Sequence, residues 1–378
     1  MDPLKRQLRR PWERVGLLFV PATPMPPPHD DPSTPVEAEY MREYITYSEL
    51  FGEQPTCTQF FERLRDCGGQ AIITSLSFVN SLLYARGTLN VQTDLVNGTF
   101  DSDLTQRASQ LPDWRGRVVY SPSQILLTIK SAILESPDRD DAHDLALYSR
   151  KLNEILLIAN DLIDADIRQE LEVAEPSENP DVLARRLLSH SIRSTVANAA
   201  DAYDTLLPRA SIIFTRIARD TAVRESVGTG WMDVDALFTA ATDGLTIENY
   251  FALGWAVMQW FIGSARNPAT NSEQRQLNPT TFFSQTKVNA RLGSLFVRLL
   301  TMDRGAAQKA FGERSGALYA YDVVPFMERP LYAVRDEIIV PVSLAFLGTR
   351  LSMGAYWLLH DGMSSSDRHR WSAFLLGH

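Results

Sequence analysis

The residues best suited to chemistry by type and spacing are three carboxylates, Asp140, Asp141 and Asp144. They match the pattern DDxxD, which on a helix places carboxylates on one face, where they can hold Mg²⁺ against a diphosphate. Such chemistry needs a second acidic motif on a facing helix, and the segment 160–164 falls on the same predicted helix. A helical Mg²⁺-diphosphate enzyme is therefore one alternative. Carboxylates that favour a helix N-terminus are the simpler interpretation.

A second constellation pairs Arg185 with His190. The spacing resembles the Rx4–6H pattern of helical HEPN ribonucleases, in which the His would act on protons and the Arg on phosphate charge. That family usually places a polar uncharged or acidic residue directly after the Arg, and Arg186 stands there instead. A helical ribonuclease is a second alternative, beside a solvated basic patch on an amphipathic helix.

A third spacing, Gln285 and Lys287, resembles the QxK variant of restriction-type nuclease sites. Those residues act from a strand, whereas Asn278-Pro279 predicts the start of a helix that continues through this segment. The sequence contains no P-loop, GxGxxG, HExxH or GxSxG motif, and its six histidines show no metal-ligand spacing. We therefore expect no cofactor. Whether the chain is an enzyme is left open, and a non-catalytic role is favoured.

An aromatic cluster could line a ligand pocket. It consists of Tyr250, Phe251, Trp255, Trp260 and Phe261. Aromatic residues at helical spacing belong far more often to a core, and this segment has aromatic side chains on more than one side. We therefore predict a central core helix over 246–264.

Composition limits the class of protein. A chain of 378 residues can form one to three domains with a sizeable core. Apolar residues make up 44% and charged residues 22%, which is ordinary for a soluble globular protein. The net charge of -9 and the pI near 5.3 argue against a surface dedicated to coating nucleic acid, because such surfaces are normally basic.

The two cysteines and the most apolar segment bear on location. Cys57 and Cys67 fall on one predicted helix, about 15 Å apart at its rise per residue, which is too far for a disulfide. Reduced, buried cysteines in a cytoplasmic protein are expected. No signal peptide is visible. The segment 338–359 contains Pro341 and Arg350, so we predict a core helix there and no membrane span.

Helical signals dominate from Val36 onward. The segments 56–59 and 121–124 both fit a capping box, and Pro122 strengthens the second. Gly87 is placed to end a helix. The predicted helices, besides the one that begins near residue 56, cover 70–86, 141–166, 180–207, 211–225, 233–241, 246–264, 279–300 and 344–359.

No alternation of strands and helices appears, and residues 88–119 are expected to form a long connection. We therefore predict an all-α fold, an irregular multi-helix bundle with an extended Pro-rich N-terminal arm at residues 1–36. Two helical layers, 37–175 and 176–378, are expected to follow the arm. The boundary between them is placed in the acidic loop near Pro176.

The last fifty residues resemble a pattern found in large bacterial proteins. The pattern consists of Arg329-Pro330-Leu331-Tyr332, then Pro341, then 350–359 with Tyr356-Trp357, then 371–377. In those proteins a helical N-terminal half leads into a C-terminal PD-(D/E)xK restriction-type nuclease domain, and many are suspected of defence against phages. The resemblance implies a helical module that works with a nuclease domain, in a longer protein or on a partner subunit. The sequence ends at His378, about where that domain would follow.

The final helical pattern carries Trp371, Phe374 and Leu375. A short terminal helix needs a covering surface, so we expect these residues to bind a protein partner or a further domain. The leading hypothesis is a non-catalytic helical scaffold or sensor module of a bacterial defence or nuclease system. It would be cytoplasmic, without a membrane segment, and would reach nucleic acid through its partner.

Overall fold

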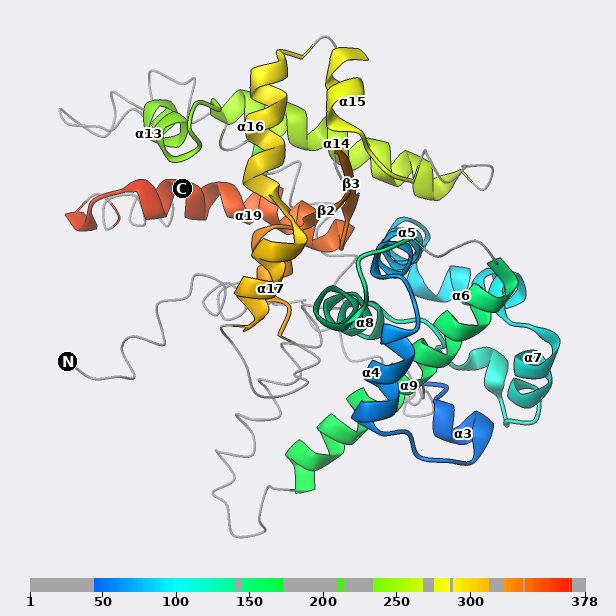
Figure 1. The fold of residues 1–378 in the computed structure, drawn as a ribbon. Coiled ribbons are helices and arrows are strands. Elements are labelled where there is room, and N and C mark those ends of the chain that lie inside the picture. Colours follow the sequence, from blue (N-terminus) through cyan, green and yellow to red (C-terminus); the bar gives the residue numbers. More distant parts are fainter. Residues whose placement is uncertain are drawn as a thin grey trace, which may run out of the picture. The chain divides into compact units, whose positions relative to one another are not determined.

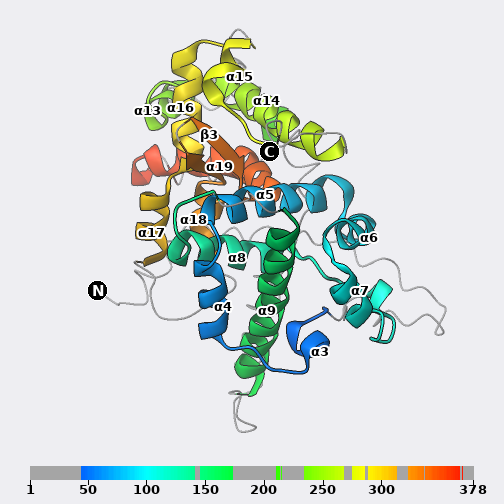
Figure 2. The same cartoon turned by 45° about the vertical axis from the view of Figure 1, so that its right-hand side comes forward.

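The computed structural model confirms the all-α prediction, because helices make up most of the described chain and a single small sheet accompanies them (Figures 1 and 2). Among the described residues, no helix combines the length and the apolar character that crossing a membrane requires. The expected N-terminal arm at residues 1–36 lies outside this part of the chain. The structure describes residues 44–140, 145–172, 210–212, 214, 234–267, 275–285, 288–312, 322–335, 337–366 and 368.

The chain divides into two compact units, called unit 1 and unit 2 below. The boundary that was expected at residues 175 and 176 falls outside the described residues, so it stays a prediction. Unit 1 comprises Met1–Ile72, Thr88–Asn198 and Gly316–Val324, and unit 2 comprises Ile73–Gly87, Ala199–Ser315 and Pro325–His378.

Unit 1 is built around one long helix, α9 (Leu145–Glu172), which corresponds to the predicted helix over 141–166. The helices α3, α4, α6 and α8 pack against it, and both views show α4 and α8 beside it (Figures 1 and 2). The other helices of the unit are α3 (Tyr47–Phe51), α4 (Cys57–Arg65), α6 (Thr88–Thr99), α7 (Ser102–Ala108), the 3₁₀ turn η2 (Trp114–Gly116) and α8 (Pro122–Glu135).

Both predicted capping boxes are present in unit 1. At α4 the Thr56 side chain accepts from the Gln59 N–H, and Gln59 Oε1 accepts from the Thr56 N–H at 2.8 Å. At α8 the same exchange joins Ser121 and Gln124, and Pro122 occupies the first turn. Each box satisfies donors that the helix itself cannot satisfy, so these helices begin where the sequence predicted.

The connection expected over residues 88–119 is wrong, because α6 and α7 lie within it. Their pattern is weak for a physical reason. Gln92 on α6 is only 6% exposed, so a polar residue occupies a core position and interrupts the apolar period.

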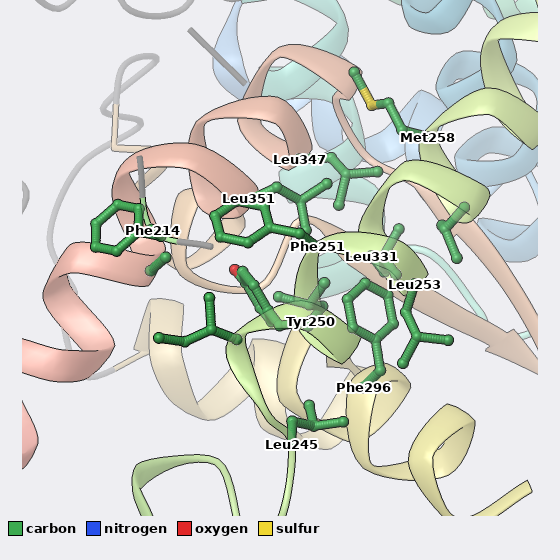
Figure 3. Packing of buried hydrophobic residues seen from close by; sticks show 14 of the residues in the cluster. Phe214, Leu245, Tyr250, Phe251, Leu253, Met258, Phe296, Leu331, Leu347 and Leu351 are labelled. Atoms are coloured by element: carbon green, nitrogen blue, oxygen red, sulfur yellow. The ribbon is translucent and has the colours of Figure 1, made fainter. Parts of the chain in front are cut away.

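Unit 2 is centred on α14 (Ile247–Arg266), the predicted core helix. Tyr250, Phe251 and Phe261 are buried in one continuous apolar cluster, so the aromatic residues of this helix form core, as predicted (Figure 3). Helix α19 (Leu344–Gly362) packs against α14 and against α13 (Val234–Ala241). The other helices of the unit whose bounds the structure describes are α5 (Gly69–Arg86) from residue 73 onward, α15 (Pro279–Gln285), α16 (Ala290–Leu300), α17 (Arg304–Gly312) and α18 (Val324–Glu328) from residue 325 onward.

A small three-stranded sheet accompanies the helices of unit 2. Strand β2 (Leu331–Arg335) pairs in parallel with β1 (Thr301–Met302) and antiparallel with β3 (Ile338–Pro341). Glu337 makes the turn between β2 and β3 with a φ of 59°. The predicted core helix over 338–359 is therefore a strand followed by α19. Most side chains of β2 and β3 are buried, so their sequences lack the alternation of apolar and polar residues by which a half-buried strand is predicted.

The single helix predicted over 279–300 is also wrong. The chain forms α15 and α16, which pack against each other, and Asn289 caps α16 by accepting from the Arg291 N–H at 2.9 Å. A Cβ on Gly293 would lie 2.5 Å from Phe283 Cδ2. The two helices therefore meet at a glycine, a close approach that one continuous helix could not make.

Candidate functional site

A group of buried polar side chains lies in the described part of unit 1, and we call it the polar centre. It connects α9 to the start of α3, to α6 and to the chain that leads into α8. Its members are Gln92, Tyr120, Gln124, Asn153, Asn160 and Asp161, each of which is at least nine-tenths buried.

Asp161 supplies the one carboxylate of the polar centre. It is 4% exposed, and its oxygens accept from the Ser48 N–H at 2.9 Å and from the Ser48 hydroxyl at 2.5 Å. Gln54 Nε2 donates to the same carboxylate at 3.5 Å. Ser48 lies in the first turn of α3, so Asp161 caps that helix from a distant part of the chain.

Gln92 binds the extended chain before α8 in the way that a neighbouring strand would. Its Oε1 accepts from the N–H groups of Val119 and Tyr120, both at 3.0 Å, and its Nε2 donates to the Tyr120 carbonyl at 2.8 Å. The Tyr120 hydroxyl donates to Asn153 Oδ1 at 2.6 Å, and Asn153 Nδ2 donates to the Thr99 carbonyl at 2.8 Å. These bonds join α6, the extended chain and α9.

Asn160 on α9 and Gln124 on α8 also bind backbone groups of other segments. Asn160 Nδ2 donates to the Ile45 carbonyl at 2.8 Å, and Gln124 Nε2 donates to the Leu156 carbonyl at 2.6 Å. The Ile45 N–H in turn donates to the Val118 carbonyl at 3.0 Å. The amide side chains therefore bind backbone carbonyl groups of other segments, Ile45 before α3 and Leu156 inside α9.

A set of partly exposed ion pairs borders the polar centre. Arg150 on α9 contacts Asp101 at 2.8 Å, Asp103 at 3.0 Å and Glu154 at 3.1 Å. Glu154 also pairs with Arg63 of α4. Hydrogen bonds that Arg150 donates to Glu154 and Asp103 raise the pKa of its guanidinium, and the same bond from Arg150 lowers the pKa of the Asp103 carboxyl. The network fixes α7 and α4 against α9.

Burial sets the proton affinities of the polar centre. Desolvation raises the pKa of the Asp161 carboxyl, and the hydrogen bonds from Ser48 offset only part of this effect. Burial also raises the pKa of the Tyr120 phenol. The donors and acceptors of the polar centre face one another, so a substrate would have to displace bonds that hold unit 1 together. The hydrogen bonds of the polar centre therefore hold α3, α6 and the chain before α8 in place against α9.

The predicted site residues fall mostly outside the described chain. Asp140 is exposed in the loop after α8, while Asp141 and Asp144 are not described. Gln285 is exposed at the end of α15. The described ranges hold no group of three His, Cys, Asp or Glu side chains that could bind a metal ion. The other predicted site residues outside the described ranges are Arg185, His190, Lys287, Trp371, Phe374 and Leu375.

The cysteines differ from each other. Both are free, and Cys67 is buried as expected, whereas Cys57 is exposed at the first position of α4. The expectation that both are buried is wrong for Cys57, because it stands at the very start of α4, while Phe60 and Leu64, one and two turns further along the helix, reach the core.

Sequence reasoning missed the polar centre as a unit, although a signal was present. The helix predicted over 141–166 carries Asn153 and, seven residues later, Asn160, both at positions that the structure buries. Polar amides that recur every two turns on an apolar face indicate buried hydrogen bonds to distant backbone.

Comparisons with known proteins identified no relative of this chain. A scan against protein-family models found no match. Searches of curated proteins and of solved structures also found no match.

Proposed function

We propose that this chain is a non-catalytic helical scaffold or sensor module of a bacterial defence or nuclease system. It acts in the cytoplasm through a protein partner or through a nuclease domain that supplies the chemistry. Contact with nucleic acid is made by that partner.

One observation carries the non-catalytic part of the proposal. Two described, buried residues of unit 1 that could do acid–base chemistry, Asp161 and Tyr120, are bonded to Ser48 and Asn153 of the same chain. Their bonds join segments that lie far apart in the sequence. Such a network gives a rigid body, which is what a scaffold requires.

The nuclease part of the proposal rests on the C-terminal sequence pattern. The described portion of that pattern forms the β2–β3 hairpin and α19, and both pack into the core of unit 2. The terminal residues Trp371, Phe374 and Leu375 supply the apolar side chains that we assign to partner binding. The free cysteines support a reducing, cytoplasmic setting.

A nuclease assay tests the non-catalytic assignment. The purified chain, incubated with DNA or RNA and with Mg²⁺ or Mn²⁺, should cleave neither. Metal-dependent cleavage that is lost in Gln285→Ala or Lys287→Ala would refute the proposal. Ser284→Ala is the matched control, because Ser284 is an exposed neighbour of Gln285 on α15.

An interaction assay tests the partner assignment. The tagged chain should capture a nuclease subunit from its native host, and Trp371→Ala or Phe374→Ala should reduce the capture. Ile212→Ala is the matched control, since Ile212 is an exposed apolar side chain, 66% accessible, outside the C-terminal segment. Equal capture by all three variants would exclude the C-terminal residues as the binding surface.

A further inference from the structure

The first turn of α5 is capped by carbonyl groups of a distant loop. The Gly69 N–H donates to the Pro137 carbonyl at 2.8 Å, and the Gln70 N–H donates to the Arg139 carbonyl at 3.3 Å. Gln70 Nε2 also donates to Asp138 Oδ1 at 3.1 Å. The first N–H groups of a helix have no carbonyl partner within it. The loop 137–139 therefore completes the start of α5, and both belong to unit 1.

Gly69 is required by the closeness of this loop. A Cβ at this position would lie 3.2 Å from the Pro137 carbonyl oxygen and 3.3 Å from Ser136 Cβ. Both contacts are tighter than ordinary packing, and one of the two atoms belongs to the backbone. An added methyl group would push the loop and the first turn apart.

The body of α5 belongs to unit 2, from residue 73 onward. There Asn80 Nδ2 donates to the Val342 carbonyl at 2.8 Å, and both residues are buried. The Arg275 guanidinium lies 4.0 Å from the centre of the Phe78 ring. This part of the helix is held by contacts that the capping loop does not make.

We infer that α5 is a coupling helix, whose cap in unit 1 and packing in unit 2 stabilise one shared ladder of hydrogen bonds. In an α-helix each N–H donates to the carbonyl four residues earlier, so the amides of residues 73–76 depend on the carbonyls of 69–72. Helix formation is cooperative, so loosening either end weakens the other. The inference concerns stability alone and does not depend on the proposed function.

Hydrogen–deuterium exchange of the full chain tests the coupling. Gly69→Ala should speed exchange about tenfold for the amides of 73–86, because the loss of the cap raises the population of open helix. Gly98→Ala and Gly263→Ala are the matched controls, since a Cβ at either glycine meets nothing within 4 Å. Both controls should leave exchange in α5 unchanged.

A substitution in the unit 2 part of α5 tests the same coupling independently. Asn80→Ala removes the bond to Val342 and should speed exchange at the Gly69 and Gln70 amides, because a coupling free energy is reciprocal. If Gly69→Ala does not fold, the Asn80→Ala variant alone tests the coupling. Faster exchange confined to 69–72 in Gly69→Ala, or an unchanged first turn in Asn80→Ala, would overturn the inference.

Discussion

Gly254→Ala is the sharpest test of how unit 2 is packed. Gly254 lies on α14, and a Cβ there would lie 2.5 Å from Leu351 Cδ2 and 3.0 Å from Leu351 Cδ1. Leu351, on α19, is 0% exposed, so its side chain has no solvent to move into. The substitution therefore forces α14 and α19 apart or forces Leu351 out of its rotamer.

The expected cost follows from two opposing effects. Overpacking a core costs about 1–3 kcal/mol. Replacing Gly by Ala inside a helix returns about 1 kcal/mol through helix propensity. Gly263→Ala on the same helix has only the second effect, because nothing lies within 4 Å of its Cβ. The difference between the two variants isolates the steric term, and we expect it to be about 1–3 kcal/mol.

Urea unfolding followed by far-UV circular dichroism measures this difference in the free energy of unfolding. In a Leu351→Ala background, Gly254→Ala should cost much less than in the wild type, since the methyl group then enters the space that Leu351 vacates. Equal stabilities of Gly254→Ala and Gly263→Ala, within about 0.5 kcal/mol, would refute the close contact between α14 and α19.

Three further predictions concern unit 1 and the ribonuclease alternative. Gln92→Leu should lower the free energy of unfolding by at least about 3 kcal/mol, because it leaves the Val119 N–H and both backbone groups of Tyr120 buried without a hydrogen-bond partner. A loss below about 1 kcal/mol in urea unfolding would contradict the role of Gln92 in the polar centre. Asp161→Asn should gain less stability than the wild type as the pH falls from about 7 to about 4. The reason is that burial raises the pKa of the Asp161 carboxyl in the folded state. The stabilising contribution of Asp161 is therefore present below the unfolded-state pKa and is lost as the pH rises through the folded-state pKa. Identical dependence of stability on pH in the two proteins would exclude a raised pKa for Asp161. His190→Ala should change nothing in an RNA cleavage assay, whereas loss of metal-independent cleavage would favour the ribonuclease.

The helix starts and stops that carry a capping or glycine signal were predictable from the sequence, because each such signal acts within a few residues. The capping boxes at 56–59 and 121–124 both form as predicted. Gly87 follows α5 with a φ of 81°, a backbone conformation that glycine adopts without strain. The core helix over 246–264 was predictable because its aromatic side chains repeat at helical spacing. These features need no distant partner.

The small sheet could not be predicted in the same way. Strand β2 pairs with β3 close by, yet it also pairs with β1 from thirty residues earlier, at Thr301↔Leu331. The bridge between Leu277 and Ile339 joins a still more distant segment. An apolar run that is buried on both faces shows no period, so only the pairing partner decides between strand and helix.

By itself, the sequence determined that this chain is helical and where several of the described helices begin, among them α4, α8, α14 and α19. Only the tertiary structure decided what the buried carboxylate does. Asp161 reads as one more acidic residue on a long helix, but its partner, Ser48, is 113 residues away. No local window contains both residues, and burial, which raises the carboxyl pKa, arises only when α3 packs on α9. In the folded chain this one carboxylate is part of the cap of another helix, α3.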